Sequence, residues 1–329
     1  MEEVSPVKKR CHVASISQSR LFMEDEPDKK NSPVWNDVED GVKTEAGNHP
    51  NVIDQCTVFF VKEAYNDIVL FLALLAKVVS LNPEVIIMPF SAKPGKYEDE
   101  LIAILKTYRG IIIAVNAAPS ERAKKELPNL RGFVGPNEKE MAEMAAENLL
   151  SSHRVRKIII PNDKPNLGGY QERAEKIREI ASRYNVESVE EIYFNPDDEK
   201  TFEIVPEEGT AITALGPMGT KLALRVRENY PDRIVGITTM DMDEVTKEAI
   251  KANILTSVIQ NPHEQGVRAV QMAVDILEGK NTSTAYKTLF CRAKLITTMM
   301  LIALQHTFLE KTHCIAMCVV FYIDYFLNS

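Results

Sequence analysis

The segment around Gln260 carries the most informative chemistry of this sequence. An apolar run over residues 254–259 predicts a strand that ends at Gln260, and Pro262 then changes the direction of the chain. Gly266 opens a predicted amphipathic helix. A glutamine at a strand end can donate and accept hydrogen bonds where ligands of α/β proteins bind, although an ordinary strand-to-helix loop gives the same pattern.

Motifs for catalysis or metal binding are absent from the sequence. There is no G-x-G-x-x-G after a strand, no P-loop, no nucleophile elbow and no paired carboxylates at motif spacing. The six histidines are isolated, and the five cysteines are odd in number and scattered, which indicates reduced thiols. We therefore predict a protein that is not an enzyme, needs no cofactor and holds no metal.

Length and charge restrict the class of protein further. With 329 residues, 45% of them hydrophobic, the chain is long enough for two lobes with separate cores. Its formal net charge of -8 repels a phosphate backbone, and no basic patch is evident in the sequence apart from the short cluster at residues 8–10. Direct nucleic-acid binding is not expected.

Apolar strand runs alternate with amphipathic helix runs along most of the chain, a pattern typical of parallel sheets covered on both faces. The first series has predicted strands at 11–17, 56–61, 84–89 and 110–115, and helices at 35–46, 68–80 and 97–108. The second has predicted strands at 132–134, 157–160, 188–193, 210–214, 233–237 and 254–259, and helices at 138–150, 169–184, 219–229 and 242–252. Two α/β lobes follow from these two series.

The strand, Gln260, Pro262 and helix, together with the strand at 13–17 and the segment Ser32-Pro33-Val34-Trp35, resemble the type I periplasmic binding proteins. This is the superfamily of ribose-binding proteins and the lac-repressor core, and the resemblance covers about residues 11–298. It implies an α/β fold of two doubly wound parallel-sheet lobes joined by a three-crossover hinge. The expected division is a tail at 1–10, lobe 1 at 11–134 plus 261–282, lobe 2 at 135–260 plus 283–298, and an apolar extension at 299–329.

The resemblance also implies ligand-binding residues in the first lobe. Trp35, the only tryptophan, matches an aromatic side chain that stacks on a sugar ring, although it could instead fasten the first helix to its lobe. Asn116 stands where the family usually presents an Asp, and Ala117 where an Arg often follows. The charged Asp-Arg pair of the family is therefore replaced here by a single amide side chain.

In the second lobe the resemblance implies ligand roles for Arg173 and Gln260, with an exposed Arg173 paired to Glu175 as the alternative. The family's Asn-Asp pair is replaced by Leu215-Gly216. The carboxylate of a later Val-Gly-x-Asp motif is either replaced by Thr238 or displaced to Asp241. The scaffold is thus better matched than the site.

The implied function is non-enzymatic binding of a small polar ligand, most simply a sugar, in an interlobe cleft whose closure a transporter or receptor partner reads. Two alternatives are the effector core of a transcriptional regulator without its DNA-binding head, and a degenerate binding protein without a ligand. An enzyme is the least favoured class.

The ends of the chain give weaker expectations. No apolar signal segment is visible at the start, which predicts a cytoplasmic location, whereas the resemblance implies a periplasmic or extracellular one. The charged stretch at 22–31 is expected to be an inserted loop. The apolar residues after 298 are divided by Glu310, Lys311 and His313, so we expect an additional helix or two, or an erroneous end of the translated gene, and no membrane span.

Overall fold

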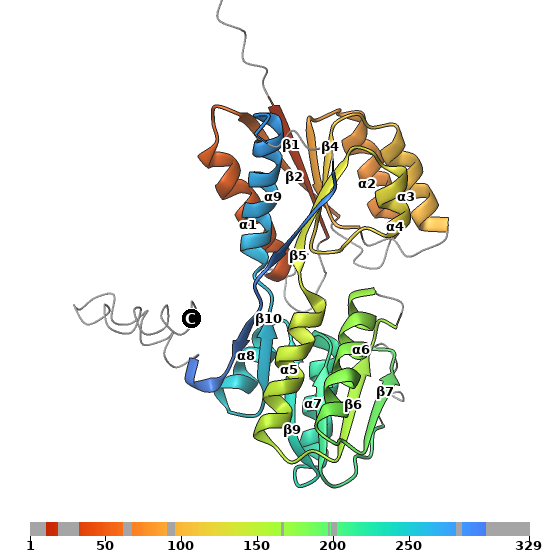
Figure 1. The fold of residues 1–329 in the computed structure, drawn as a ribbon, viewed down its shortest axis with the longest axis vertical. Coiled ribbons are helices and arrows are strands. Elements are labelled where there is room, and N and C mark those ends of the chain that lie inside the picture. Colours follow the sequence, from red (N-terminus) through yellow and green to blue (C-terminus); the bar gives the residue numbers. More distant parts are fainter. Residues whose placement is uncertain are drawn as a thin grey trace, which may run out of the picture. The chain divides into compact units, whose positions relative to one another are not determined.

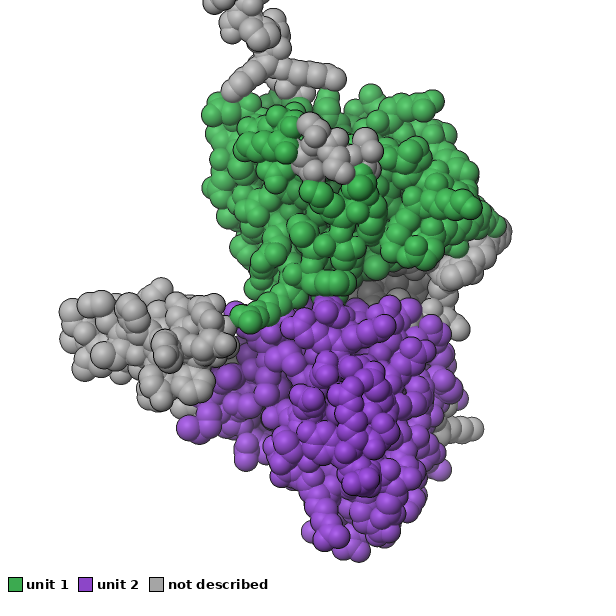
Figure 2. All heavy atoms as spheres, viewed as in Figure 1, with its two compact units in different colours: residues 1–136, 261–292 green, residues 137–260, 293–329 purple. Residues whose placement is uncertain are grey.

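The chain divides into two compact units, and it passes from one to the other three times. Unit 1 comprises residues 1–136 and 261–292, and unit 2 comprises 137–260 and 293–329 (Figure 2). The computed structural model describes residues 11–18, 33–61, 68–90, 96–165, 168–196, 198, 203–280 and 285–300. The expected α/β fold with two parallel-sheet lobes is confirmed.

Unit 1 is built on a six-stranded sheet in the order β11-β5-β4-β3-β1-β2 (Figure 1). Every pairing between these described strands is parallel. The inner strands are almost continuous apolar runs because both faces of a parallel sheet are covered. The strands are β1 (Cys11–Gln18), β2 (Ile53–Val61), β3 (Val85–Met88), β4 (Ile111–Val115), β5 (Leu130–Pro136) and β11 (Lys287–Cys291).

Helices cover both faces of this sheet. Ile86 belongs to the core under α2 (Ile68–Ser80), α3 (Lys96–Lys106) and the short α4 (Glu121–Glu126). Its neighbour Ile87 belongs to the core under α1 (Pro33–Asn48) and α9 (Pro262–Leu277). Successive side chains of a strand point to opposite faces, so the alternation places one core on each side of the sheet.

Helices α1 and α9 lie side by side at a distance that only glycine permits (Figure 1). A Cβ added to Gly266 would stand 2.1 Å from the backbone oxygen of Val38, and one added to Gly41 would stand 2.1 Å from the backbone oxygen of His263. Both obstacles are backbone atoms, which cannot swing aside as the end of a side chain can. The two glycines therefore set the spacing of this helix pair.

Unit 2 repeats the plan with the strand order β12-β10-β9-β8-β6-β7, in which only β12 is antiparallel to its neighbour among the described pairings. Helices α5 (Glu138–Ser152) and α6 (Gly168–Arg183) pack on one face, and α7 (Pro217–Asn229) and α8 (Glu244–Lys251) on the other. The strands are β6 (Lys157–Asn162), β7 (Ser188–Tyr193), β8 (Thr210–Ala214), β9 (Ile234–Met240), β10 (Thr256–Ile259) and β12 (Lys294–Ile296).

The structure corrects the grouping of one strand and one boundary between the lobes. The strand expected to start the second series is β5, which belongs to the sheet of unit 1. Residues 285–292, expected in the second lobe, also belong to unit 1, because β11 pairs in parallel with β5 from Lys287 to Cys291. Only β12, after the third crossing, returns to unit 2.

Several expectations lie outside the described residues, namely the tail at 1–10, the inserted loop at 22–31 and the structure of the extension beyond residue 300. Within the described part of the chain, no helix combines the length and the apolar character that crossing a bilayer requires.

Candidate functional site

Two polar side chains meet where β9 and β10 end in unit 2. Asp241 follows β9 and Gln260 follows β10, and these strands are parallel neighbours. The Gln260 Nε2 donates a hydrogen bond of 2.7 Å to the Asp241 Oδ1. Asp241 has a φ of 72°, a left-handed conformation that Asp adopts more readily than most residues. Because Gln260 is only 8% exposed, the pair is held in a fixed position at the carboxyl edge of the sheet.

Arg173 on α6 lies beside the Asp241 carboxylate of this pair. It is 3% exposed, and its Nε donates a hydrogen bond of 2.5 Å to the Glu138 Oε2. One terminal nitrogen donates to the Leu215 backbone oxygen at 2.5 Å and lies 3.8 Å from the Asp241 Oδ2. Arg173 is therefore not the exposed helical arginine of the alternative interpretation. We call the set of Glu138, Arg173, Asp241 and Gln260 the strand-end cluster.

Charge and burial oppose each other in the strand-end cluster. Burial raises the pKa of the Glu138 carboxyl, although the charge of Arg173 acts to lower it. Burial also opposes the charge of Arg173, but the carboxylates of Glu138 and Asp241 outweigh it and raise the guanidinium pKa above its ordinary value. Arg173 thus stays charged and compensates two carboxylates at once.

Tyr170, one turn before Arg173 on α6, takes up the space beside Gly216. A Cβ added to Gly216 would stand 2.0 Å from the Tyr170 hydroxyl. The Tyr170 ring also lies 5.5 Å from the Arg173 guanidinium carbon, within the range of a cation–π contact. The Leu215-Gly216 segment therefore contributes a backbone oxygen to Arg173 and leaves room for a tyrosine hydroxyl, in place of two polar side chains.

Thr238 is not at the strand end. It lies inside β9, is fully buried, and its hydroxyl is 3.3 Å from that of Thr256. Thr256 in turn donates to the Asn148 Oδ1 of α5 at 2.9 Å. Thr238 thus belongs to the packing of the sheet against α5. Of the two alternatives for the displaced carboxylate, Asp241 is the one placed at the edge of the sheet.

In unit 1, Asn116 follows β4 and has a φ of 63°, which asparagine tolerates. Its Nδ2 donates a hydrogen bond of 3.1 Å to the Gln265 Oε1 in the first turn of α9. Gln265 is completely buried. Gln265 was not predicted as a site residue from the sequence, although a polar residue at an inward position of an amphipathic helix was the available signal.

Trp35 lies in the core of unit 1. It is 5% exposed and belongs to the apolar cluster between the sheet and helices α1 and α9. A ring enclosed in this way cannot present its face to a ligand. The packing supports the alternative interpretation, in which Trp35 fastens the first helix to its lobe, and it does not support the stacking role.

Replacing Trp35 with alanine is therefore expected to lower the free energy of unfolding by about 3 to 5 kcal/mol, as for other large core truncations. Trp35→Phe should lose a smaller part of this because it keeps most of the buried area. Urea denaturation of both variants measures the effect. A Trp35→Ala variant that unfolds like the parent protein would contradict the core assignment.

The comparisons with known proteins identify the family. Residues 27–281 match the periplasmic binding protein domain, so the chain belongs to this family of substrate-binding proteins, which are typically periplasmic or extracellular. No curated protein matches the sequence significantly. The expected resemblance to type I periplasmic binding proteins is thereby confirmed.

Solved structures share the fold at low sequence identity. A periplasmic ribose ABC transporter structure from Conexibacter woesei DSM 14684 has a TM-score of 0.69 and 17% identity, and the match covers 90% of this chain and 95% of that one. GanP, a glucose-galactose binding protein from Geobacillus stearothermophilus, has a TM-score of 0.67 and 17% identity, with 89% and 99% covered. An ABC transporter solute binding protein from Bacillus halodurans C-125 with bound myo-inositol has a TM-score of 0.65 and 18% identity, with 89% and 96% covered.

Proposed function

We propose that this protein binds a small polyhydroxylated, sugar-like ligand without altering it, as the binding component of a transport or sensing system. The observation that carries the proposal is the Asp241–Gln260 pair of the strand-end cluster, a carboxylate and an amide held together at the carboxyl edge of a parallel sheet. Membership of a family of substrate-binding proteins supports the proposal. The fold is also that of structures named for binding glucose and galactose or containing myo-inositol.

The chemistry of the cluster suits hydroxyl groups. A carboxylate accepts hydrogen bonds from hydroxyls, and an amide both donates and accepts them. We assign ligand contact in unit 2 to Asp241 and Gln260, and a positioning role to Arg173, because its nitrogens already bond to Glu138 and Leu215. Asn116 remains a candidate ligand contact in unit 1.

Recognition without turnover fits the same arrangement. The charge of Arg173 is shared between two carboxylates, so neither carboxylate is left as an uncompensated buried base. Among the described residues, no group of three or more His, Cys, Asp or Glu side chains could hold a metal ion. We therefore infer a binding protein and not an enzyme.

A thermal-shift screen of the whole chain against pentoses, hexoses, sugar alcohols and nucleosides tests the proposal. A ligand at about one hundred times its dissociation constant stabilises the folded protein by about 2.7 kcal/mol, which gives a clear rise in the unfolding temperature. Recovery of the ligand after incubation shows whether it has been altered. A screen in which nothing binds would favour the degenerate binding protein, and an altered ligand would refute the non-enzymatic proposal.

For a ligand found in this way, Gln260→Ala and Asp241→Asn are each expected to weaken binding by about 1 to 3 kcal/mol, because a ligand hydroxyl loses its partner. The Asp241→Asn substitution places at this position a residue that also tolerates the left-handed backbone. Calorimetry measures the affinities, with Glu147→Gln on the exposed side of α5 as the control. An affinity that is unchanged in both variants would show that the ligand does not contact Asp241 or Gln260.

Location and partner follow from the same proposal. The family is typically periplasmic or extracellular, which fits a ligand-binding component of a transporter or receptor. The cytoplasmic location stays a prediction from the sequence. Cell fractionation of the native organism, with detection of the full chain, distinguishes the two locations.

A further inference from the structure

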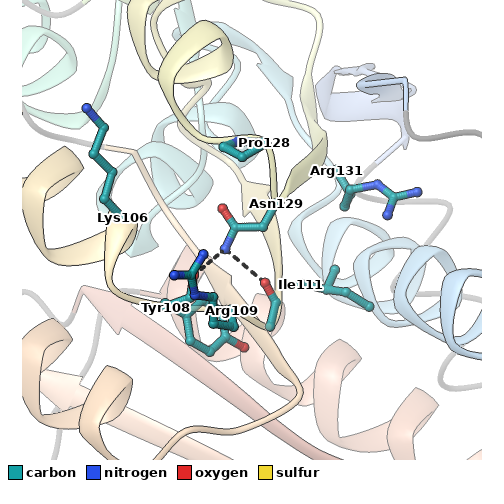
Figure 3. A pocket seen from close by; sticks show the side chains of 8 residues that line it. Lys106, Tyr108, Arg109, Ile111, Pro128, Asn129 and Arg131 are labelled. Atoms are coloured by element: carbon teal, nitrogen blue, oxygen red, sulfur yellow. Dashed lines mark hydrogen bonds between the residues drawn. The ribbon is translucent and has the colours of Figure 1, made fainter.

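Unit 1 contains a pocket of about 590 Å³ at the end of the sheet opposite to Asn116 (Figure 3). Its lining comes from the last residue of α3, the residues that lead into β4, and the residues at the start of β5. Asn116 follows the carboxyl end of β4, whereas the pocket lies at the amino ends of β4 and β5. The pocket is therefore separate from the candidate contact at Asn116.

Hydrogen bonds hold three of the residues that line the pocket in place, namely Tyr108, Gly110 and Asn129. Asn129 donates from its Nδ2 to the backbone oxygens of Tyr108 at 3.0 Å and Gly110 at 2.9 Å, the two dashed lines in Figure 3. The buried Tyr108 hydroxyl donates to the Pro83 backbone oxygen at 2.8 Å. These bonds tie the residues before β4 to the residues before β5, so the pocket does not depend on a single exposed loop.

The charge of the pocket differs from that of the chain as a whole. Lys106, Arg109 and Arg131 line it, and none of the lining residues is acidic, although the protein has a net charge of -8. Lys106 and Arg109 are neighbours in the sequence, but Arg131 follows only on the next strand, so the three cations come together only when β4 and β5 pair. Arg109 is exposed and forms no ion pair with any residue in the described ranges.

Glu126 competes with an incoming anion for Lys106. It accepts a hydrogen bond from the Lys106 Nζ at 2.6 Å and another from the Arg122 Nε at 2.7 Å. These bonds lower the pKa of Glu126 to about 2, so the carboxylate remains ionised at neutral pH. The Lys106 side chain is 51% exposed, and exposed ion pairs are weak, so an incoming anion can displace this one.

We propose that this pocket binds a small molecule with two or more anionic groups, phosphates or carboxylates, independently of the sugar-like ligand. In Figure 3 the Lys106 and Arg131 side chains extend to opposite sides of Asn129, with Arg109 between them. The three cations come from the end of α3, the segment before β4 and strand β5. An elongated ligand with separated charges can pair with several, and guanidinium groups suit phosphate and carboxylate oxygens.

Isothermal titration of the full chain with pyrophosphate and with citrate, at constant ionic strength, tests the proposal. At least one probe should bind, and Arg109→Gln and Arg131→Gln should each weaken it by about tenfold. Glu126→Gln should strengthen binding by about twofold to fivefold because Lys106 loses its internal competitor. Arg154→Gln, which removes an exposed arginine of unit 2, should leave binding unchanged.

Three results would overturn the proposal, namely no binding of either probe, weaker binding by Glu126→Gln, or an equal loss in Arg154→Gln that indicates a general charge effect. Affinity for a ligand from the sugar screen should be the same in Arg109→Gln and in the parent protein. This second titration separates a failure of the anion pocket from a failure of the proposed sugar-like binding.

Discussion

Gly266→Ala is expected to lower the free energy of unfolding by about 3 kcal/mol, although it adds only one methyl group. The new Cβ would meet the Val38 backbone oxygen at 2.1 Å and the Val42 backbone nitrogen at 2.8 Å. Helices α1 and α9 must move apart to admit it, and this opens the apolar cluster that both helices share with the sheet. Urea denaturation with linear extrapolation measures the loss.

The same helix pair supplies the control. Gly47 lies near the end of α1, and a Cβ added there would meet nothing within 4 Å. Gly47→Ala should therefore be neutral or stabilise the protein by up to about 1 kcal/mol, because alanine favours the helix. Equal unfolding free energies for Gly266→Ala and Gly47→Ala would refute the close approach of the helices.

A double variant sharpens this test. Once Gly266→Ala has separated the helices, Gly41→Ala meets less resistance, since its own obstacle is the His263 backbone oxygen on α9. The combined loss should be smaller than the sum of the two single losses, as expected for sites that share one contact. Additive losses would indicate two unrelated effects.

The architecture of both units was predictable because buried parallel strands leave a strong pattern in the sequence. The run Ile111–Val115 is apolar throughout, and the helices that follow such strands repeat their apolar residues with helical spacing. Strand β11 leaves no such pattern. Its residues Lys287–Cys291 are mostly exposed at the edge of the sheet, and only the pairing with β5 defines them as a strand. Edge pairing is a tertiary effect that periodicity does not encode.

The candidate site was predictable where position along a strand decides the outcome. Gln260 and Asp241 directly follow their strands, so both reach the edge of the sheet. The roles of Trp35 and Arg173 depend instead on which other elements enclose them, and spacing does not give this. Glu138, the partner of Arg173, was missed, although it lies shortly after β5, as Asp241 and Gln260 lie after their strands.

Arg173→Met is expected to lower the free energy of unfolding by about 3 to 5 kcal/mol, the usual consequence of removing one partner from a buried ion pair. The substitution keeps most of the side-chain volume but leaves Glu138 and Asp241 without their shared cation. The Leu215 backbone oxygen also loses its donor. Arg178→Met, on the same helix, removes only an exposed arginine that pairs with Glu191, and should change stability by about 1 kcal/mol or less.

The loss in Arg173→Met should also depend on pH, with a sign that packing alone does not give. Burial already raises the pKa of Glu138, and Arg173 is the neighbour that acts to lower it. Without Arg173 the folded pKa rises further above its unfolded value, so the folded state favours the protonated carboxyl. Stability from a raised carboxyl pKa is present at low pH and is lost as pH rises through that pKa. The difference in unfolding free energy between the parent and Arg173→Met should therefore shrink as the pH falls from neutral towards the ordinary range of a glutamate. A difference that is constant across this range would show that Arg173 contributes through packing and not through its charge.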